Sequence, residues 1–522
     1  MTATSTSLEL HDRSAAADLG GFGYGQELHR SIGTYASFAA GFSFVSILTT
    51  VFQLFGFGFS FAGPVFFWTW PAVFLGQILV ALCFAELAGR YPISGAIYQW
   101  SRRLGGHVLG WFAGWTMILA QVVTLAAAAI AMQAVLPAIW SGFQVVGGDP
   151  AITSVTGATN AILLGLVVLT VTTLINSLAV RVMAVVNAIG VTAELVGAAL
   201  LVVALLSRTQ RGPGIVLNTE GLTGGAGALL AAALMAAYVL VGFDSAGELS
   251  EETHNPRKTA PKTILRALVV SGIGGGLIIV AALMAAPRVG DEISSGGLAW
   301  IVTSRLGDVL GRVFLVDVVL AAFVCTLAIQ TATTRMIYSM SRDEVLPFSR
   351  HLRKVSARGG ATVHAAVLVG VLATALLLVN LGHAGAFTAL TSTCIVLLYL
   401  AYLCVTAPML YRRLNSGWPV RLGEQVDEDG KPLFSLGRWG LPVNALAVLF
   451  GLAMAINLAW PRQSIYDPEG TSPVLQYFAL IVLAVVALGG VLAFAAKRHA
   501  YREAIGVSSA STEVDPGVRV LA

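Results

Sequence analysis

Charged side chains are scarce in this sequence. Asp, Glu, Lys and Arg make up only 11% of the 522 residues, whereas soluble proteins contain about 25%. Hydrophobic residues reach 56%, and the mean hydropathy is +0.80. This composition excludes a soluble globular protein and indicates a polytopic membrane protein.

Patterns for metals, nucleotides and disulfides are also missing. The four cysteines all fall inside apolar runs, which is typical of small packing residues and not of disulfides. The eight histidines have no metal-ligand spacing, and the glycines at 21, 23 and 25 do not follow a strand, as a phosphate loop would. No basic patch alternates with stacking aromatic residues. We therefore expect no cofactor, no metal site, no nucleic-acid partner and no enzymatic centre.

Long apolar runs dominate what is present. About 20 apolar residues suffice for a helix that crosses a bilayer. The runs are continuous instead of alternating, which indicates helices and not barrel strands. The predicted spans are 34–57, 64–87, 108–136, 157–178, 183–206, 225–248, 264–286, 313–338, 362–381, 386–410, 441–460 and 474–496. The expected fold is an all-α polytopic membrane protein with twelve transmembrane helices.

Basic residues set the expected orientation. If the N-terminus is inside, cytoplasmic segments hold most of the 31 Lys and Arg residues, so both termini are expected in the cytoplasm. The polar N-terminal segment has no apolar core and is expected to be a tail, not a signal peptide. The excess of arginine over lysine, with abundant alanine, glycine and valine, indicates a high-GC bacterial genome. The expected location is therefore the plasma membrane, that is, a bacterial inner membrane. The expected divisions are a tail at 1–30, a core at 31–410, a cytoplasmic loop at 411–440, two further helices at 441–497 and a tail at 498–522.

The segment from Leu240 to Lys262, LVGFDSAGELSEETHNPRKTAPK, breaks the pattern of the sixth span. Gly242 and Asp244 interrupt it, and acidic residues follow. A charged side chain near the bilayer centre costs about 2.5–3.5 kcal/mol on insertion scales. Transporters interrupt helices in this way to expose backbone groups to small polar solutes.

The first span carries a matching interruption at Gly41 and Ser43. Each glycine alone could serve close helix packing. Two interruptions five helices apart, however, are what a five-plus-five inverted repeat predicts, with helices 1–5 related to helices 6–10 and two C-terminal helices added. The two interruptions are expected to face each other near the midplane.

Four segments carry a family resemblance. They are GYGQELHRSIGTYASFAAGFSFVSIL at 23–48, FAELAGRYPISGAIYQWSRRLGG at 84–106, GFDSAGELSEETHNPRKTAPKTI at 242–264 and TRMIYSMSRDEVLPFS at 334–349. The chain resembles amino acid permeases of the amino acid–polyamine–organocation superfamily, and within it the amino acid/choline transporter branch that includes GABA permeases. The resemblance implies a leucine-transporter-like fold and secondary active transport by alternating access.

The resemblance also implies where the substrate binds. It places a substrate carboxylate at the first-helix interruption, Gly41–Val45, with Ser43 as a hydrogen-bond donor. Phe42 and Phe44 flank this serine, whereas many relatives have small residues there. The expected substrate is GABA or a similar small amino acid. Because aromatic faces suit a cationic headgroup, choline, another amine or a polyamine remains the alternative.

The sixth helix is expected to complete the binding site. Gly242 opens the backbone, Phe243 packs over the solute, and Asp244 either caps the following half-helix or binds an amine or a proton. Gln121 and Gln330 lie inside the third and eighth spans, where they either line the pathway or bond neighbouring helices.

Glu194 is a lone carboxylate in the middle of the apolar fifth span. Low-dielectric surroundings disfavour its charged form, so it can take up a proton near neutral pH. In proton-coupled relatives an ionisable residue on this helix replaces a sodium ion, which implies proton symport. The alternatives are a protonated structural carboxyl group, sodium coupling, with hydroxyls such as those of Thr331 or Thr333 as ligands, and exchange.

Charged residues at the inner face are expected to control cytoplasmic access. They are Glu86, Glu251, Arg342 and Asp343. A solvated loop contact is the alternative for the last two. A channel or a membrane receptor is a remote alternative for the whole chain, because no repeated filter motif or sensor-sized domain is present.

Overall fold

The computed structural model is helical over most of the residues that it describes. These are residues 19–222, 224–357, 359–379, 381, 386–415, 418, 426, 427, 430–466, 470 and 473–510. Within this part of the chain no strand forms, and the only β-type pairing consists of isolated bridges. Most of the predicted N-terminal tail, half of the predicted C-terminal tail and part of the 411–440 loop lie outside the described residues.

The main helices follow the predicted apolar runs. The first half contains α2 (Thr34–Val45), α3 (Ile47–Ala62), α4 (Thr69–Arg90), α5 (Ala96–Gly105), α6 (His107–Ile130), α7 (Leu136–Ile139), α8 (Val155–Leu178) and α9 (Val180–Leu206). The second half contains α10 (Gly225–Val239), α11 (Ser245–Glu248), α12 (Pro256–Ala285), α13 (Asp291–Arg342), α14 (Ser349–Leu352), α15 (Val363–Val379) and α16 (Ala386–Asn415). The helices α17 (Gly440–Ala459), α18 (Gln463–Tyr466) and α19 (Phe478–Ala510) follow.

The number of membrane crossings stays a prediction. Nine helical stretches among the described residues are long and apolar enough to cross a bilayer. One of them, Thr34–Arg90, joins the first two predicted spans, and the apolar helices α10 and α15 are shorter than the rest.

The eighth predicted span, 313–338, is the second part of a longer helical stretch. The 52-residue α13 contains two residues with non-helical backbone, Gly297 (φ 57°) and Gly307 (φ 75°). Glycine adopts positive φ without steric penalty, so the chain bends at both positions and stays helical between them. The residues before 313 therefore form additional helical turns that apolar periodicity alone did not predict.

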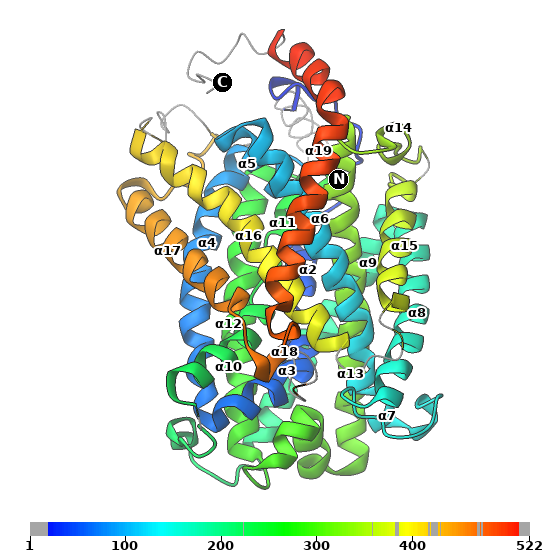
Figure 1. The fold of residues 1–522 in the computed structure, drawn as a ribbon, viewed down its shortest axis with the longest axis vertical. Helices are drawn as coiled ribbons and strands as arrows, with labels where there is room; N and C mark the ends of the chain where they lie inside the picture. Colours follow the sequence, from blue (N-terminus) through cyan, green and yellow to red (C-terminus); the bar gives the residue numbers. More distant parts are fainter. Residues whose placement is uncertain are drawn as a thin grey trace, which may run out of the picture.

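Helices of the two halves pack against each other. α6 packs on α16, α4 on α12, and α3 on α13. Along the bundle, α5 and α14 lie at one end and α7 at the opposite end (Figure 1). Apolar residues such as Val167 and Leu174 on α8 and Val203 on α9 are exposed on the outside, as expected for a surface that faces lipid. This packing brings the two interrupted helices into the centre of the bundle.

Candidate functional site

The first spanning helix is interrupted at Ser46. This residue has φ 39° and ψ 86°, a left-handed conformation, and it separates α2 from α3. The predicted position of the interruption, Gly41–Val45, is therefore wrong. Those five residues are helical and belong to α2, and the helix is interrupted at the residue that follows them. Their backbone N–H groups are thus not free to bind a substrate carboxylate.

Gly41 has a packing role instead. A Cβ atom on Gly41 would lie 3.2 Å from the Cβ of Ala267 and 3.4 Å from that of Ala246. The glycine thus lets α2 approach α12 and α11 closely. The sequence pattern predicts an interruption at this glycine, but Gly41 serves close packing and the helix is interrupted later, at Ser46.

Glu194 lies against the first interruption. Its Oε1 accepts hydrogen bonds from the Ser46 hydroxyl (3.0 Å) and from the backbone N–H of Leu48 (3.1 Å). The Leu48 N–H belongs to the first turn of α3, where helical N–H groups have no partner within the helix. Glu194 is fully buried, and its Oε2 has no hydrogen-bond partner among the described residues. A carboxyl group on α9 therefore holds the start of α3.

The sixth spanning helix is interrupted between α10 and α11, as predicted. Gly242 has φ 93°, and its backbone N–H donates to the Tyr402 hydroxyl (3.0 Å). The Ser245 hydroxyl donates to the carbonyl of Ala40 on α2 (3.3 Å). A Cβ on Gly242 would lie only 1.9 Å from Cδ1 of Phe44. The two interruptions thus face each other at close range.

Asp244 does not cap α11 with its side chain, which corrects one of the two predicted roles. Its own backbone is helical (φ −68°, ψ −17°), and its carboxylate makes no capping hydrogen bond. Instead the Tyr402 hydroxyl on α16 donates to the Asp244 carboxylate. Tyr402 was missed by sequence reasoning, because nothing in the tenth span distinguishes one tyrosine from the apolar residues around it.

The remaining predicted binding residues lie on α2, on α6 and α13, and at the sixth-helix interruption. The Gln121 amide donates to Glu248 (3.2 Å), whereas the Gln330 amide donates to Thr173 (2.7 Å) and so bonds neighbouring helices. Phe243 is buried against the rings of Tyr402 and Phe84. The buried residues Phe42, Ser43 and Val45 lie on α2, and the Ser43 hydroxyl has no partner among the described residues.

A small cavity lies between the helices that meet at the interruptions. Its volume is about 10 Å³, room for about one water molecule. It is lined by Phe44, Thr49, Thr50, Gln53, Thr124, Ala128, Tyr238, Val241, Cys325, Ile329 and Leu398. Of the predicted binding residues only Phe44 contributes to this lining. The threonine hydroxyls at this cavity were not predicted.

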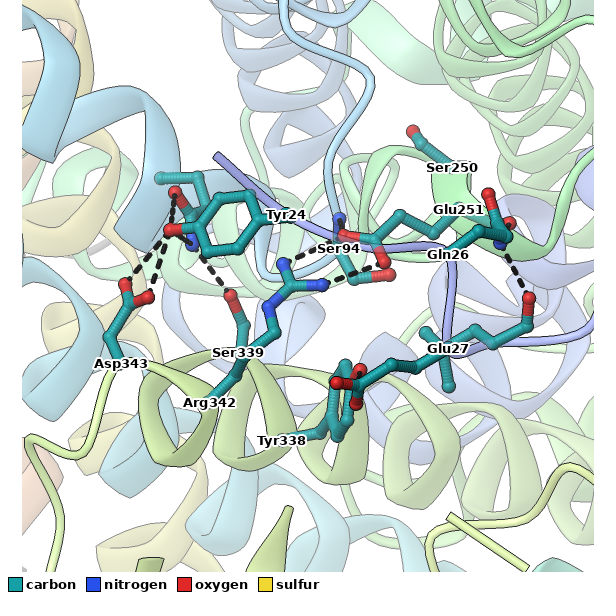
Figure 2. A network of polar contacts seen from close by, with 12 residues as sticks. Tyr24, Gln26, Glu27, Ser94, Ser250, Glu251, Tyr338, Ser339, Arg342 and Asp343 are labelled. Atoms are coloured by element: carbon teal, nitrogen blue, oxygen red, sulfur yellow. Dashed lines mark hydrogen bonds and ion pairs between the residues drawn. The ribbon is translucent and has the colours of Figure 1, made fainter. Parts of the chain in front are cut away.

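A buried polar network lies where α13 ends (Figure 2). The Arg342 guanidinium donates to both carboxylate oxygens of Glu251 (2.8 and 2.9 Å), and the Ser94 backbone N–H also donates to Glu251 (3.0 Å). The Arg342 side chain is 7% exposed. Of the two predicted environments for Arg342, the solvated loop contact is therefore excluded.

Asp343 belongs to the same network through the N-terminal segment. The Tyr24 hydroxyl donates to Asp343 (2.9 Å), Arg102 of α5 pairs with it, and the Arg342 guanidinium lies 3.9 Å from the centre of the Tyr24 ring. Burial, and then the Asp343 carboxylate, raises the pKa of the Tyr24 phenol. Tyr24 is therefore a neutral hydrogen-bond donor. Glu86 lies apart, in a buried ion pair with Arg413.

Comparison with known proteins identifies the family. A family model described as "Amino acid permease" matches residues 31–494. The chain belongs to the amino acid permease family. The "Amino-acid permease BAT1" of Arabidopsis thaliana is 28% identical over 89% of this chain and 91% of its own length. The "Methylthioribose transporter" of Bacillus subtilis is 26% identical over 64% of this chain and 74% of its own length.

A solved transporter shares the fold of this permease. The crystal structure of MhsT in complex with L-phenylalanine has a TM-score of 0.59 at 15% identity and covers 83% of this chain and 99% of that chain. This similarity confirms the leucine-transporter-like fold, and the family match confirms the predicted superfamily. The permease is a multi-pass membrane transporter of small molecules, and its relatives are transporters and not enzymes. The GABA-permease-like branch stays a prediction.

Proposed function

We propose that this permease is a secondary active transporter that carries GABA or a similar small amino acid together with one proton. It would work by alternating access in the plasma membrane, with both termini in the cytoplasm. The observation that carries the proposal is the position of Glu194, a buried carboxyl group bonded directly to the interruption of the first helix.

The hydrogen bonds of Glu194 support the proposed proton coupling. A buried carboxylate without a counter-ion is costly, so Glu194 favours its protonated form while the site is closed. Its Oε1 accepts from Ser46 and Leu48, so a change in its charge alters the hydrogen bonds that hold α2 and α3 together. Protonation and the closure of the site over the solute would therefore be linked.

An amino acid substrate is supported by the family and by the chemistry of the cavity. Relatives are named amino acid permeases, and MhsT binds L-phenylalanine. The hydroxyl groups of Thr49 and Thr50 line the cavity. In the closed structure Thr50 donates to the carbonyls of Val45 and Ser46, and Thr49 is bonded to the Ser46 hydroxyl, so we propose that they turn to a substrate carboxylate when the cavity opens. We propose that Ser43, whose hydroxyl has no partner among the described residues, joins them when the cavity opens.

Glu251, Arg342 and Asp343 are proposed to close the cytoplasmic side, together with the separate ion pair of Glu86 and Arg413. The basic residues Arg102 of α5 and Arg350 of α14 lie on elements at one end of the bundle (Figure 1), and the positive-inside rule assigns this end to the cytoplasm. The division into a core at 31–410 and two added helices at 441–497 belongs to the same proposal.

Glu194→Gln is expected to abolish accumulation driven by a pH gradient while solute exchange continues. Glutamine mimics the protonated carboxyl group and cannot release a proton. The measurement is GABA uptake into proteoliposomes at clamped membrane potential, with a pH gradient and without sodium. Glu220→Gln is the control, because this side chain is exposed. Wild-type accumulation by the Glu194→Gln protein would leave Glu194 as a structural residue, and uptake that requires a sodium gradient would establish sodium coupling.

Ser43→Ala is expected to raise the apparent KM for GABA. A charge-assisted hydrogen bond contributes about 1.5–3 kcal/mol, which corresponds to a change of about 10- to 150-fold. Initial uptake rates over a range of GABA concentrations measure it, with Ser60→Ala, an exposed serine of α3, as the control. If choline competes fully for uptake and GABA does not, the substrate is an amine and the proposed amino acid is wrong.

A further inference from the structure

Four buried acidic residues lie within nine positions of the sixth spanning helix, and among the described residues two of them have counter-ions. The two terminal nitrogens of the Arg342 guanidinium, Nη1 and Nη2, donate to the two carboxylate oxygens of Glu251. Nε and Nη2 of Arg335 likewise donate to the two carboxylate oxygens of Glu252. Asp244 and Glu248 precede this pair in the sequence and are 1% and 0% exposed. They have no arginine or lysine partner in the part of the chain that the structure describes.

The hydrogen bonds around Asp244 and Glu248 leave an excess of acceptors. Tyr402 donates to Asp244, and the Gln121 amide donates to Oε1 of Glu248. Three buried oxygens then have no donor: Oδ2 of Asp244, Oε2 of Glu248 and Oε1 of Gln121. Gln121 is 0% exposed and bonded to Glu248, so its free carbonyl oxygen lies next to the acid pair. The missing component is a donor that carries positive charge.

The charged groups on the neighbouring elements are occupied or distant. α11 packs on α2, α5, α12 and α13. Arg335 and Arg342 of α13 bind Glu252 and Glu251, and Arg102 of α5 binds Asp343. The other titratable groups on α2, α5, α6 and α12 are Tyr35, Tyr98, Arg103, His107, Arg257, Lys258, Lys262 and Arg266. On α13, Tyr338 donates to Glu27, and Arg305 and Arg312 precede Arg335 by several helical turns. On α16, Tyr402 donates to Asp244, Arg412 donates to the carbonyls of Arg103 and Leu104, and Arg413 pairs with Glu86. Tyr98 donates to Asp343, Arg103 to Gln99, and Lys262 and Arg266 are exposed.

Two like charges one helical turn apart cannot both persist in a buried site without a cation. The simplest cation that fits the closed structure is a proton bound to one carboxylate. The resulting O–H group is a hydrogen-bond donor and needs no space beyond the oxygens already present. A proton on Oε2 of Glu248 would bond to Oδ2 of Asp244 or, after rotation of the amide, to Gln121.

We propose that Asp244, Glu248 and Gln121 form a proton-binding site on the cytoplasmic half of the sixth helix, separate from Glu194. One proton is shared by the two carboxyl groups while the Arg342–Glu251 network is closed. When that network opens, cytoplasmic water reaches the pair, the O–H bond of one carboxylic acid breaks, and the proton leaves as hydronium to leave two hydrated carboxylates. On closing, a proton returns from the cytoplasm.

This site makes cytoplasmic opening depend on internal pH without moving a net proton across the membrane. The inference rests on the alternating access of the proposed function but not on Glu194 as the coupling residue. Because opening releases one proton, acidification of the interior favours the closed form. The population of the open form falls by up to about tenfold for each unit by which internal pH is lowered.

The test is solute exchange in proteoliposomes with GABA on both sides, external pH fixed and internal pH stepped at clamped potential. The starting protein is Glu194→Gln, because it removes the proposed coupling proton. Its exchange rate is expected to fall as internal pH is lowered, by up to about tenfold per unit. Adding Glu248→Gln or Asp244→Asn should reduce that change to less than about twofold.

Two further variants keep the result unambiguous. Gln121→Leu removes a donor that favours the ionised Glu248, so its rate profile should shift to higher internal pH. Asp308→Asn, an exposed carboxylate on α13, should retain the full dependence. A Glu248→Gln protein that keeps the slope, or a starting protein without one, overturns the site. If the Glu194→Gln protein does not exchange GABA, the proposed role of Glu194 in coupling is wrong, which is a separate result. The acid pair is then tested in the otherwise wild-type protein, where Glu248→Gln must remove the dependence of exchange on internal pH.

Discussion

An Arg342→Ala variant is expected to lose about 3–5 kcal/mol of stability, because it leaves the Glu251 carboxylate buried without its counter-ion. Glu251 is fully buried, and both of its oxygens accept from Arg342. The same change removes the guanidinium that lies 3.9 Å from the Tyr24 ring. Thermal unfolding of the purified protein in detergent measures the loss, and exchange assays should show that the cytoplasmic side no longer closes.

The matched control is another arginine–glutamate pair. Arg353 and Glu344 are 3.0 Å apart, with side chains 42% and 47% exposed. Exposed pairs contribute about 0–1 kcal/mol, so Arg353→Ala should have little effect. An Arg342→Met/Glu251→Met double variant removes both charges and should recover stability without recovering transport. Equal losses for Arg342→Ala and Arg353→Ala would show that burial of the first pair does not determine its contribution.

Gly242→Ala is expected to abolish transport. The backbone at Gly242 has φ 93°, and a left-handed conformation costs a non-glycine residue about 1–2 kcal/mol. The added Cβ would also lie 1.9 Å from Cδ1 of Phe44, so the two interrupted helices would have to separate. Uptake and exchange by the reconstituted variant measure the effect, and both should fall to background.

Two variants separate backbone strain from the steric clash. Gly106 has a similar φ of 89°, but a Cβ there would meet no atom within 4 Å. Gly106→Ala therefore tests strain alone and should retain transport. Gly242→Ala/Phe44→Ala removes the clash and keeps the strain, so it should restore exchange in part. If Gly106→Ala is as inactive as Gly242→Ala, the contact with Phe44 is not the reason for the glycine.

The sequence was most informative where a single physical constraint dominates. A bilayer requires long apolar helices with internally bonded backbones, so continuous hydrophobic runs predicted the all-helical fold. The glycine and aspartate at 242 and 244 predicted the sixth-helix interruption, because few residues other than glycine adopt φ 93°. Family motifs then predicted the superfamily, which the match over residues 31–494 confirms.

Details of the site were less predictable. The first interruption was expected at Gly41–Val45, but it lies at Ser46, a residue that rarely adopts positive φ on its own. Hydrogen bonds from Ser46 and Leu48 to Glu194, 148 and 146 positions away in the sequence, stabilise it. Likewise capping of α11 was one of the two roles predicted for the Asp244 side chain, but it makes no capping hydrogen bond and accepts from Tyr402 of α16 instead.

By itself, then, the sequence determined the membrane class, the all-helical fold, the superfamily and the presence of carboxyl groups inside apolar spans. Tertiary structure alone decided which of these groups have partners. Glu251 and Glu252 pair with arginines, Glu194 holds the start of α3, and Asp244 and Glu248, four positions apart, have no cation among the described residues. The reason is physical: the charge state of a buried carboxyl group depends on the donors within hydrogen-bond distance, and those donors come from helices far apart in the sequence.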